Sequence, residues 1–333
     1  MGHHQVLIVG GGAGGITVAA RLKRFRPSLE VAILEPSSEH YYQPGWTLVG
    51  GGVFTMAQTR RQEADLIPAG VTWVREAVAG FDPNNNSVST SGGQTLTYDA
   101  LVVATGLKLN WDAIKGLPEA LGKGGVCSNY SKDFAAYTWE CIQNFKGGNA
   151  VFTCAPMPIK CPGAPQKIAY LADDAIKRDP AVAAKSKVIY ATATPGIFGI
   201  PAYAAPLREV VARKGIDARY NHTLIEVRPD SKEAVFKVSK EGEEPREEVI
   251  PYALLHVTPP MAMRLAYRNW GAASVTGDIS KDFDLVDGVR LQGVMQRPDG
   301  TPFIEPRWLQ VNPNTFSVPA EEWIGTALID GTF

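Results

Sequence analysis

The sequence has few cysteines, no long apolar run and almost no net charge. Its four cysteines are unevenly spaced in 333 residues, which is unlike a disulfide framework, so we expect free thiols that are candidates for catalysis. No run of about 18 apolar residues is present, so the sequence predicts no membrane-spanning helix. A net charge of −1 without a basic block argues against nucleic-acid binding. No cysteine and histidine cluster has metal-ligand spacing, and no metal site is predicted.

The length and composition describe a globular protein with a large core. Hydrophobic residues make up 45% of the chain and charged residues 20%, as in ordinary globular domains. A chain of 333 residues is too long for one ordinary core, so we expect two domains or one large α/β assembly. An apolar strand begins at Val6, so close to the first residue that we expect no signal or transit peptide.

A glycine-rich turn near the start of the chain lies between two predicted strands. The apolar residues 6–9 predict a buried strand, and residues 10–15 (GGGAGG) fit the pattern G-x-G-x-x-G. A helical pattern follows, and a second apolar strand at 31–34 ends at Glu35. Strand, glycine turn, helix and acidic residue occur in the order of a dinucleotide-binding βαβ unit.

Each residue of this motif has a physical reason to bind a dinucleotide. Gly10 permits the tight turn, Gly12 lets the backbone approach a pyrophosphate, and Gly15 lets the helix pack closely on the strand. The pyrophosphate is expected at the helix N-terminus, at Ala13, because free N–H groups and the helix dipole favour anions there. Glu35 is expected to accept hydrogen bonds from the adenosine ribose.

A later strand favours a flavin over a free nicotinamide cofactor. Residues 98–106 read as a strand that ends on Ala-Thr-Gly. This arrangement resembles the flavoproteins with two dinucleotide-binding domains, in which the segment crosses back near FAD; Thr105 and Gly106 are therefore candidate cofactor contacts. The next expected unit begins with a strand at 149–153, but no second glycine fingerprint follows it. NADH is accordingly not the expected reductant.

Two cysteines lie in a loop stiffened by proline, CAPMPIKCPGAPQK at 154–167. A helix is expected to start around 163–165, just after Cys161. A helix N-terminus and the neighbouring Lys160 and Lys167 favour a reactive thiolate at Cys161. The alternative is a small buried apolar side chain in a rigid turn.

Several longer segments resemble the sulfide:quinone oxidoreductases. They are HYYQPGWTLVGGG at 40–52, CSNYS at 127–131, PMPIKCPGAPQKI at 156–168 and LLHVTPPM at 254–261. The likeness covers roughly residues 5–261. The resemblance implies an FAD enzyme that takes sulfide sulfur onto redox cysteines and delivers electrons to a membrane quinone. It also implies sulfide, quinone and a sulfane-sulfur acceptor thiol as partners.

The resemblance assigns expected roles to individual residues. Cys161 matches the persulfide-bearing cysteine, and Cys127 matches a cysteine that only some branches of the family carry. Cys154 is a further thiol in the same loop, and for it and Cys127 simple burial is the alternative reading. Pro44 matches a position close to the flavin ring, with a plain proline turn as the alternative. Cys141 falls in a helical pattern and is expected in the core.

The resemblance also implies a place in the cell. A peripheral protein on the cytoplasmic side of a bacterial membrane is expected, or otherwise a cytoplasmic one, and a homo-oligomer is considered. The apolar segments 45–54 and 195–206 are candidates to border a quinone pocket or to touch lipid. Packing in the interior is the alternative for most of their side chains. His256, in an apolar strand, is expected to be a core residue.

The likeness to the family ends after Met261. Pro-Ala-Glu at 319–321 stands where the family has Gly, Asp and a second redox cysteine, and no cysteine follows Cys161. Natural divergence, a frameshift and truncation remain open as explanations of the segment 262–333. Two functions therefore stand: a working sulfide-oxidising flavoenzyme, or an impaired relative that binds nucleotide or carries persulfide on Cys161. An NADH:quinone oxidoreductase is a weaker third.

The predicted fold class is α/β with two Rossmann-like domains. The first is an FAD-binding domain at 1–110, completed by the C-terminal segment. The second, at 111–260, carries the redox cysteine. A diverged, irregular C-terminal segment is expected at 261–333.

Overall fold

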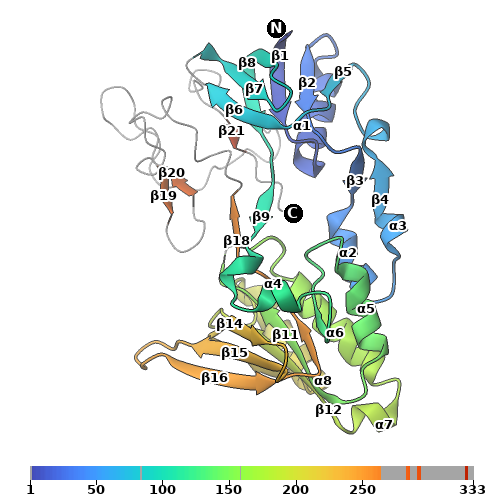
Figure 1. The fold of residues 1–333 in the computed structure, drawn as a ribbon, viewed down its shortest axis with the longest axis vertical. Coiled ribbons are helices and arrows are strands. Elements are labelled where there is room, and N and C mark those ends of the chain that lie inside the picture. The colour runs from blue at the N-terminus through green and yellow to red at the C-terminus, as the bar shows by residue number, and fades with distance from the viewer. Residues whose placement is uncertain are drawn as a thin grey trace. The chain divides into compact units, whose positions relative to one another are not determined.

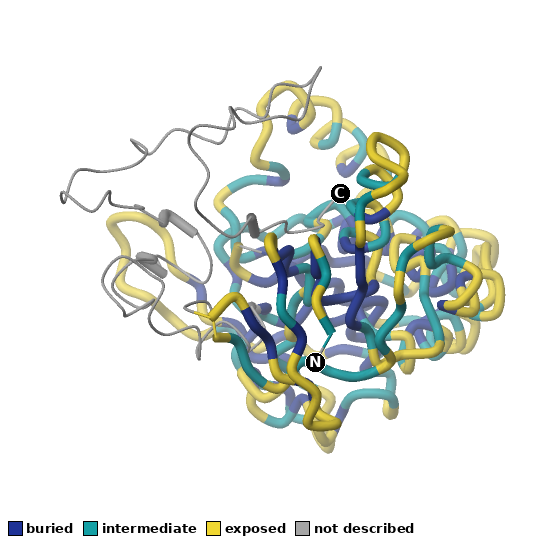
Figure 2. The backbone as a smooth tube through the Cα atoms, turned by 90° about the horizontal axis from the view of Figure 1, so that it is seen from above, coloured by how far each residue is buried: buried dark blue, intermediate teal, exposed yellow. Residues whose placement is uncertain are grey.

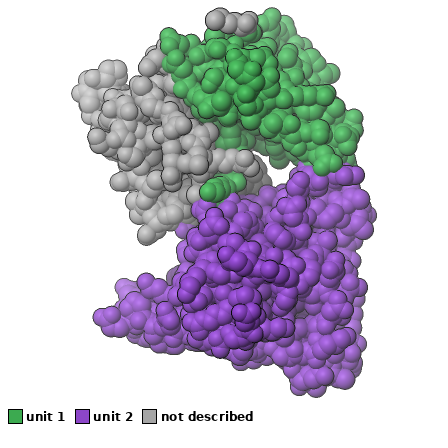
Figure 3. Space-filling model, viewed as in Figure 1, with its two compact units in different colours: residues 1–40, 61–108, 263–332 green, residues 41–60, 109–262, 333 purple. Residues whose placement is uncertain are grey.

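A computed structural model describes residues 2–82, 85–157 and 159–263, together with three short strands, β19 (Phe283–Leu285), β20 (Leu291–Gly293) and β21 (Ala327–Leu328). The chain divides into two compact units, coloured separately in Figure 3. The main described part of unit 1 lies within residues 1–40 and 61–108, and that of unit 2 within 41–60 and 109–262. The domain boundaries predicted from the sequence stay predictions, and the unusual residues 319–321 lie outside the described part of the chain.

Unit 1 is built on a twisted, mainly parallel sheet (Figure 1). Its path runs β5 (Val71–Val74), β2 (Val31–Leu34), β1 (Gly2–Val9), β8 (Thr95–Val103), β7 (Ser87–Thr90) and β6 (Val78–Asp82), and β21 also pairs with β8. The pairs β5–β2, β2–β1 and β1–β8 are parallel, and β8–β7 and β7–β6 are antiparallel. Helix α1 (Ala13–Phe25) joins β1 to β2. The predicted strand–turn–helix–strand unit is therefore confirmed.

The central strand β1 is buried on both faces, as a parallel strand between two layers must be. Val6 and Ile8 pack in one cluster with Ala19 of α1. Leu7 and Val9 point to the opposite face, where they pack with residues of β2, β7 and β8. Figure 2 shows how burial varies along the chain, with buried segments in dark blue and exposed segments in yellow. Burial on both faces holds the glycine turn that follows Val9 in a fixed place.

Unit 2 contains a second parallel sheet. Its order is β10 (Val126–Cys127), β17 (Leu254–His256), β11 (Gly148–Cys154), β12 (Ser186–Thr192) and β13 (Asp217–Arg219). Every pair in it is parallel. Its longer helices are α5 (Ala135–Gln143), α6 (Ala164–Ile176) and α8 (Pro201–Lys214), and α6 packs on β11 and β12. The predicted strand at 149–153 is thus present, as β11.

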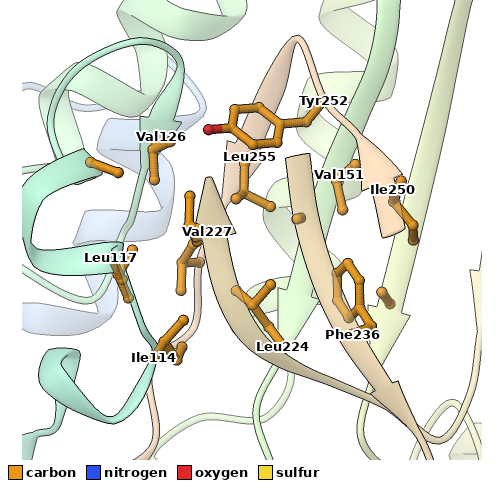
Figure 4. Packing of buried hydrophobic residues seen from close by; sticks show 14 of the residues in the cluster. Ile114, Leu117, Val126, Val151, Leu224, Val227, Phe236, Ile250, Tyr252 and Leu255 are labelled. Carbon is orange, nitrogen blue, oxygen red and sulfur yellow. The ribbon is translucent and has the colours of Figure 1, made fainter. Parts of the chain in front are cut away.

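An antiparallel three-stranded sheet covers the other face of this parallel sheet. It consists of β14 (His222–Arg228), β15 (Glu233–Val238) and β16 (Arg246–Pro251). Figure 4 shows Leu224 and Phe236 from these strands directed toward Val151 and Leu255 of the parallel sheet. His256, the next residue along β17, is fully buried and stacks on Phe152 with ring centroids 5.8 Å apart. The prediction that His256 is a core residue is confirmed.

The other elements of the fold are short. The remaining strands are β3 (Glu39–Tyr41), β4 (Arg60–Gln62), β9 (Leu107–Leu109) and β18 (Met261–Met263). The short helices are α2 (Trp46–Gly50), α3 (Met56–Thr59), α4 (Leu117–Ala120) and α7 (Pro180–Ala183), with 3-10 turns η1 (Gln43–Gly45), η2 (Glu63–Asp65) and η4 (Trp111–Ala113). The α/β fold class with two Rossmann-like units is confirmed.

Candidate functional site

The glycine turn of unit 1 has the geometry that the motif predicts. Gly10 has φ = 108°, in the region that glycine favours, and a Cβ added there would collide with the carbonyl oxygen of Ala104. A Cβ on Gly15 would collide with the carbonyl oxygen of Gly10, because α1 packs directly against the turn. A Cβ on Gly12 would meet nothing within 4 Å. Gly10 and Gly15 are therefore required for the fold, whereas Gly12 borders open space.

The N-terminus of α1 opens onto that space. Gly12 is the N-cap, no side chain caps the helix, and its first turn has no acidic residue. Gly12 and Ala13 are both exposed. The first N–H groups of a helix need partners, and an anion supplies them well. The space beside Gly12 and the uncapped N–H groups at Ala13 fit a pyrophosphate.

Glu35 lies beside the same turn, at the end of β2. Its carboxylate accepts hydrogen bonds from the backbone N–H of Gly11 and of Ser37, each at 2.8 Å. These two bonds hold the carboxylate at the glycine turn, where a ribose hydroxyl could donate to it. Thr105, which follows β8, lies at the same place, since its nitrogen would lie 3.2 Å from a Cβ on Gly10, and Gly106 is the next residue along the chain. Unit 1 thus gathers all the nucleotide-binding residues that the sequence predicts within it.

A second carboxylate lies at this turn, and the sequence does not predict it. Glu63, in η2, is only 1% exposed, and a Cβ added to Gly11 would lie 2.6 Å from its Oε1. His40 Nδ1 lies 3.3 Å from Glu63 Oε2, while Oε1 has no hydrogen-bond partner. Burial and the charge of Glu35 raise the pKa of Glu63 to about 7. Nothing in the local sequence distinguishes Glu63 from a surface glutamate.

The proline-stiffened loop of unit 2 presents Cys161 to solvent. Of the four cysteines, all within the described residues, Cys161 is the exposed one. Its φ is 49°, which is rare for a residue other than glycine and marks a constrained backbone. Its carbonyl accepts hydrogen bonds from Ala164 N and from the Tyr130 hydroxyl, each at 3.0 Å. Helix α6 begins at Ala164, as predicted, and Tyr130 and the helix together fix the Cys161 backbone.

Lys160 is held in an aromatic environment next to Cys161. Its Nζ lies 5.5 Å from the ring centroid of Trp46 and 5.5 Å from that of Tyr130. Burial lowers the pKa of Lys160 to about 8, and the neighbouring Cys161 charge opposes this shift. Lys167, the other predicted neighbour, is exposed. Lys160 is therefore the lysine whose charge interacts with Cys161, and nothing in the sequence indicates its two aromatic neighbours.

The four cysteines fall into two neighbourhoods of unit 2. Cys154, at the end of β11, is buried, and its charge and that of Cys161 both act on Tyr130. Burial raises the pKa of the Cys154 thiol, although hydrogen bonds with Tyr190 and Thr192 oppose this. Cys127 is fully buried, and its thiol interacts with that of Cys141. Cys141 lies on helix α5 as predicted, but the prediction that it is a core residue is wrong, because it is only half-buried.

The remaining predicted features lie in unit 2, some at its surface and some buried. Pro44 is exposed in the turn η1, which leads into α2. Within the two apolar segments, Val53, Ile200 and Tyr203 are at least half exposed, while Trp46 and Val49 are buried. No helix within the described residues is long and apolar enough to cross a membrane. The described residues also hold no cluster of metal-ligating side chains.

Comparisons with known proteins first identify the type of the nucleotide-binding domain. The family described as pyridine nucleotide-disulphide oxidoreductase matches residues 4–135, which include the glycine turn and β8. The solved structure of the sulfide:quinone oxidoreductase from the hyperthermophilic bacterium Aquifex aeolicus has the same fold. It superposes with a TM-score of 0.69 at 21% identity, over 87% of this chain and 64% of that one. Residues 4–135 thus form a domain of the pyridine nucleotide-disulphide oxidoreductase type.

Two curated relatives narrow this to one family. The chain is 46% identical over 281 residues to the mitochondrial sulfide:quinone oxidoreductase of Mus musculus, covering 84% of this chain and 62% of that protein. It is 33% identical over 312 residues to the mitochondrial sulfide:quinone oxidoreductase of Schizosaccharomyces pombe, covering 88% of this chain and 67% of that protein. The chain belongs to the sulfide:quinone oxidoreductase family. It spans about two thirds of the length of these relatives.

Proposed function

We propose that this chain is an FAD-dependent protein that oxidises sulfide to sulfane sulfur at Cys161 and passes the electrons to a quinone. The observation that carries the proposal is the exposed Cys161. Its backbone is held by Tyr130 and α6, and it follows Lys160, whose ammonium lies near an aromatic ring. The names of the relatives, which specify sulfide and quinone, agree with this chemistry.

The nucleotide end of the cofactor is assigned to unit 1. The N–H groups at Gly12 and Ala13 would bind the pyrophosphate, and Glu35 would accept from the ribose. Thr105 and Gly106, next to the same turn, complete this set, and Pro44 is assigned to the flavin end. When bound, FAD supplies a two-electron acceptor that a quinone can reoxidise.

The sulfur chemistry needs a second thiol beside Cys161, and we assign Cys154 to it. Sulfide attacks the Cys161 sulfur of a Cys154–Cys161 disulfide, the S–S bond breaks, and Cys154 leaves as a thiolate with the electron pair. Cys161 then carries a persulfide, whose outer sulfur passes to an acceptor thiol. The two protein thiolates re-form their disulfide when they lose two electrons. Cys154 is favoured over Cys127 because the thiol partner of Cys127 is Cys141.

Lys160 contributes a positive charge to this step. Its ammonium group attracts the hydrosulfide anion toward the Cys161 sulfur, and this Coulomb attraction is stronger in a partly desolvated site than in water. The Trp46 and Tyr130 rings hold the ammonium in place by cation–π attraction. The exposed apolar side chains Val53, Ile200 and Tyr203 are assigned to contact with a quinone-bearing membrane surface.

The proposal is tested with the purified protein supplied with FAD. A visible flavin spectrum, its loss on anaerobic addition of sulfide, and its return on addition of a soluble quinone are the expected results. Cys154→Ala is expected to bind FAD normally and to lose catalytic turnover. A colourless protein that takes up no FAD would contradict the cofactor assignment. Full turnover in Cys154→Ala would contradict the assignment of the second thiol.

A further inference from the structure

Two cysteines of unit 2 form a pair away from the Cys161 loop. Cys127 ends β10, and Cys141 lies on α5, which packs against that strand. Val126 faces the cluster that includes Leu255, so Cys127, the next residue on the strand, points to the opposite, helix-covered face. The Cys127 and Cys141 thiols lie close enough for each to shift the pKa of the other. We refer to them as the Cys127–Cys141 dithiol.

The two thiols of this dithiol differ in accessibility and acidity. Cys127 is fully buried, and burial raises its pKa well above the usual value. Cys141 is half-buried, and the neighbouring Cys127 thiol lowers its pKa, with a second contribution from Tyr137. The Tyr137 hydroxyl accepts a bond from Gly125 N at 3.2 Å, so its own proton is free to point to Cys141. Cys141 is thus the nucleophile, and Cys127 lies behind it.

A cavity gives small molecules access to Cys141. It has a volume of about 320 Å³, within the range of small-ligand pockets. Its lining includes Cys141, Tyr137, Lys146 and Lys232, with Glu140 as the acidic residue. Two ammonium groups against one carboxylate favour an anionic ligand. Because the cavity lies within unit 2, it is formed without any residue of the nucleotide site.

We propose that the Cys127–Cys141 dithiol is a second reactive site, which reduces small organic disulfides that carry carboxylate groups. The Cys141 thiolate attacks one sulfur of the disulfide, and the first small thiolate leaves. The Cys127 thiol then gives its proton to a departing thiolate and its sulfur attacks Cys141, which expels the second small thiol. The products are a Cys127–Cys141 disulfide and two small thiols, so atoms and electrons balance. This reaction needs neither a flavin nor Cys161, so it stands apart from the proposed function.

The test uses the full chain with Cys161→Ser, so that the exposed thiol does not react. Glutathione disulfide is the probe, and intact mass and peptide mapping are the measurements. A loss of two hydrogens and a cross-link between the peptides of Cys127 and Cys141 are expected. With Cys127→Ala added, a stable glutathione adduct on Cys141 is expected. With Cys141→Ala added instead, Cys127 should stay unmodified because it is fully buried. Circular dichroism checks that each variant is folded.

A charge control tests the class of ligand. Lys146→Gln combined with Lys232→Gln should slow the reaction with glutathione disulfide by about tenfold. The reaction with the neutral bis(2-hydroxyethyl) disulfide should keep its rate. If the double substitution leaves the rate with glutathione disulfide unchanged, as it does the rate with the neutral disulfide, the proposed ligand class is overturned. Absence of the Cys127–Cys141 cross-link in a folded protein, or an adduct on Cys127 in the Cys141→Ala protein, would overturn the site itself.

Discussion

Replacing Gly12 by leucine should abolish cofactor binding and leave the protein folded. A Cβ at Gly12 meets nothing within 4 Å, and its φ of −69° suits any residue. The loss of the glycine N-cap should cost no more than about 1 kcal/mol of unfolding free energy. The new side chain would occupy the space assigned to the pyrophosphate and separate it from the helix N–H groups. Loss of two charge-assisted hydrogen bonds, at about 1.5–3 kcal/mol each, weakens FAD binding by at least about 100-fold.

Two further glycines give matched controls for Gly12→Leu. Gly15→Ala should destabilise the protein itself, because its Cβ would collide with the Gly10 carbonyl. Gly199→Leu should change neither property, because Gly199 also borders open space but lies in unit 2. FAD affinity is measured by fluorescence titration, and stability by thermal unfolding of the cofactor-free protein. Wild-type FAD affinity in a folded Gly12→Leu protein would refute the placement of the pyrophosphate.

Three other predictions concern charge. Lys160→Met should slow alkylation of Cys161 by iodoacetamide at neutral pH by about 3- to 10-fold. Lys160→Arg should largely preserve the rate. Equal rates in the wild type and both variants would show that the lysine charge does not act on the thiol. Because the pKa of Glu63 is raised to about 7 in the folded protein, its contribution to stability is full below about pH 4.5 and is lost as pH rises through 7. Glu63→Gln should therefore flatten the fall of the melting temperature between about pH 4.5 and 7, and an unchanged slope would contradict the raised pKa. Burial lowers the pKa of His256 to about 3, so its contribution to stability is present above pH 6.5 and is lost toward pH 3, by about 2 kcal/mol at pH 5. His256→Gln, whose side chain can still accept a hydrogen bond from Asn129 N, should reduce this acid sensitivity in denaturant melts at a series of pH values. An unchanged dependence of stability on pH would contradict the lowered pKa.

The sequence predicted the features that depend on neighbouring residues. Gly10 and Gly15 follow from the tight turn between β1 and α1, and the start of α6 follows from Gly163 and Pro165. The burial of His256 follows from its apolar strand. In each case the signal lies within a few positions of the residue, where strand and helix periodicity or turn chemistry decides the structure.

The features that the sequence did not predict depend on contacts between distant segments. Trp46 and Tyr130 meet Lys160 only through tertiary packing, and the position of Glu63 beside Glu35 follows from the way η2 packs. Cys141 was assigned to the core because helical periodicity does not say how deeply a helix face is buried. Its position at a cavity, with Cys127 behind it, required the structure.

The central claim is that Cys161 is the thiol that receives sulfide sulfur. The direct test is the rate at which anaerobic sulfide removes the visible flavin absorbance of FAD-loaded Cys161→Ser, measured by rapid mixing against the wild type. Cys141→Ser is the matched control, because it also removes one thiol of unit 2 but lies at the separate dithiol. The account predicts normal FAD content in both variants, loss of the sulfide reaction in Cys161→Ser, and a wild-type rate in Cys141→Ser. Loss of the absorbance in Cys161→Ser at the wild-type rate would contradict it.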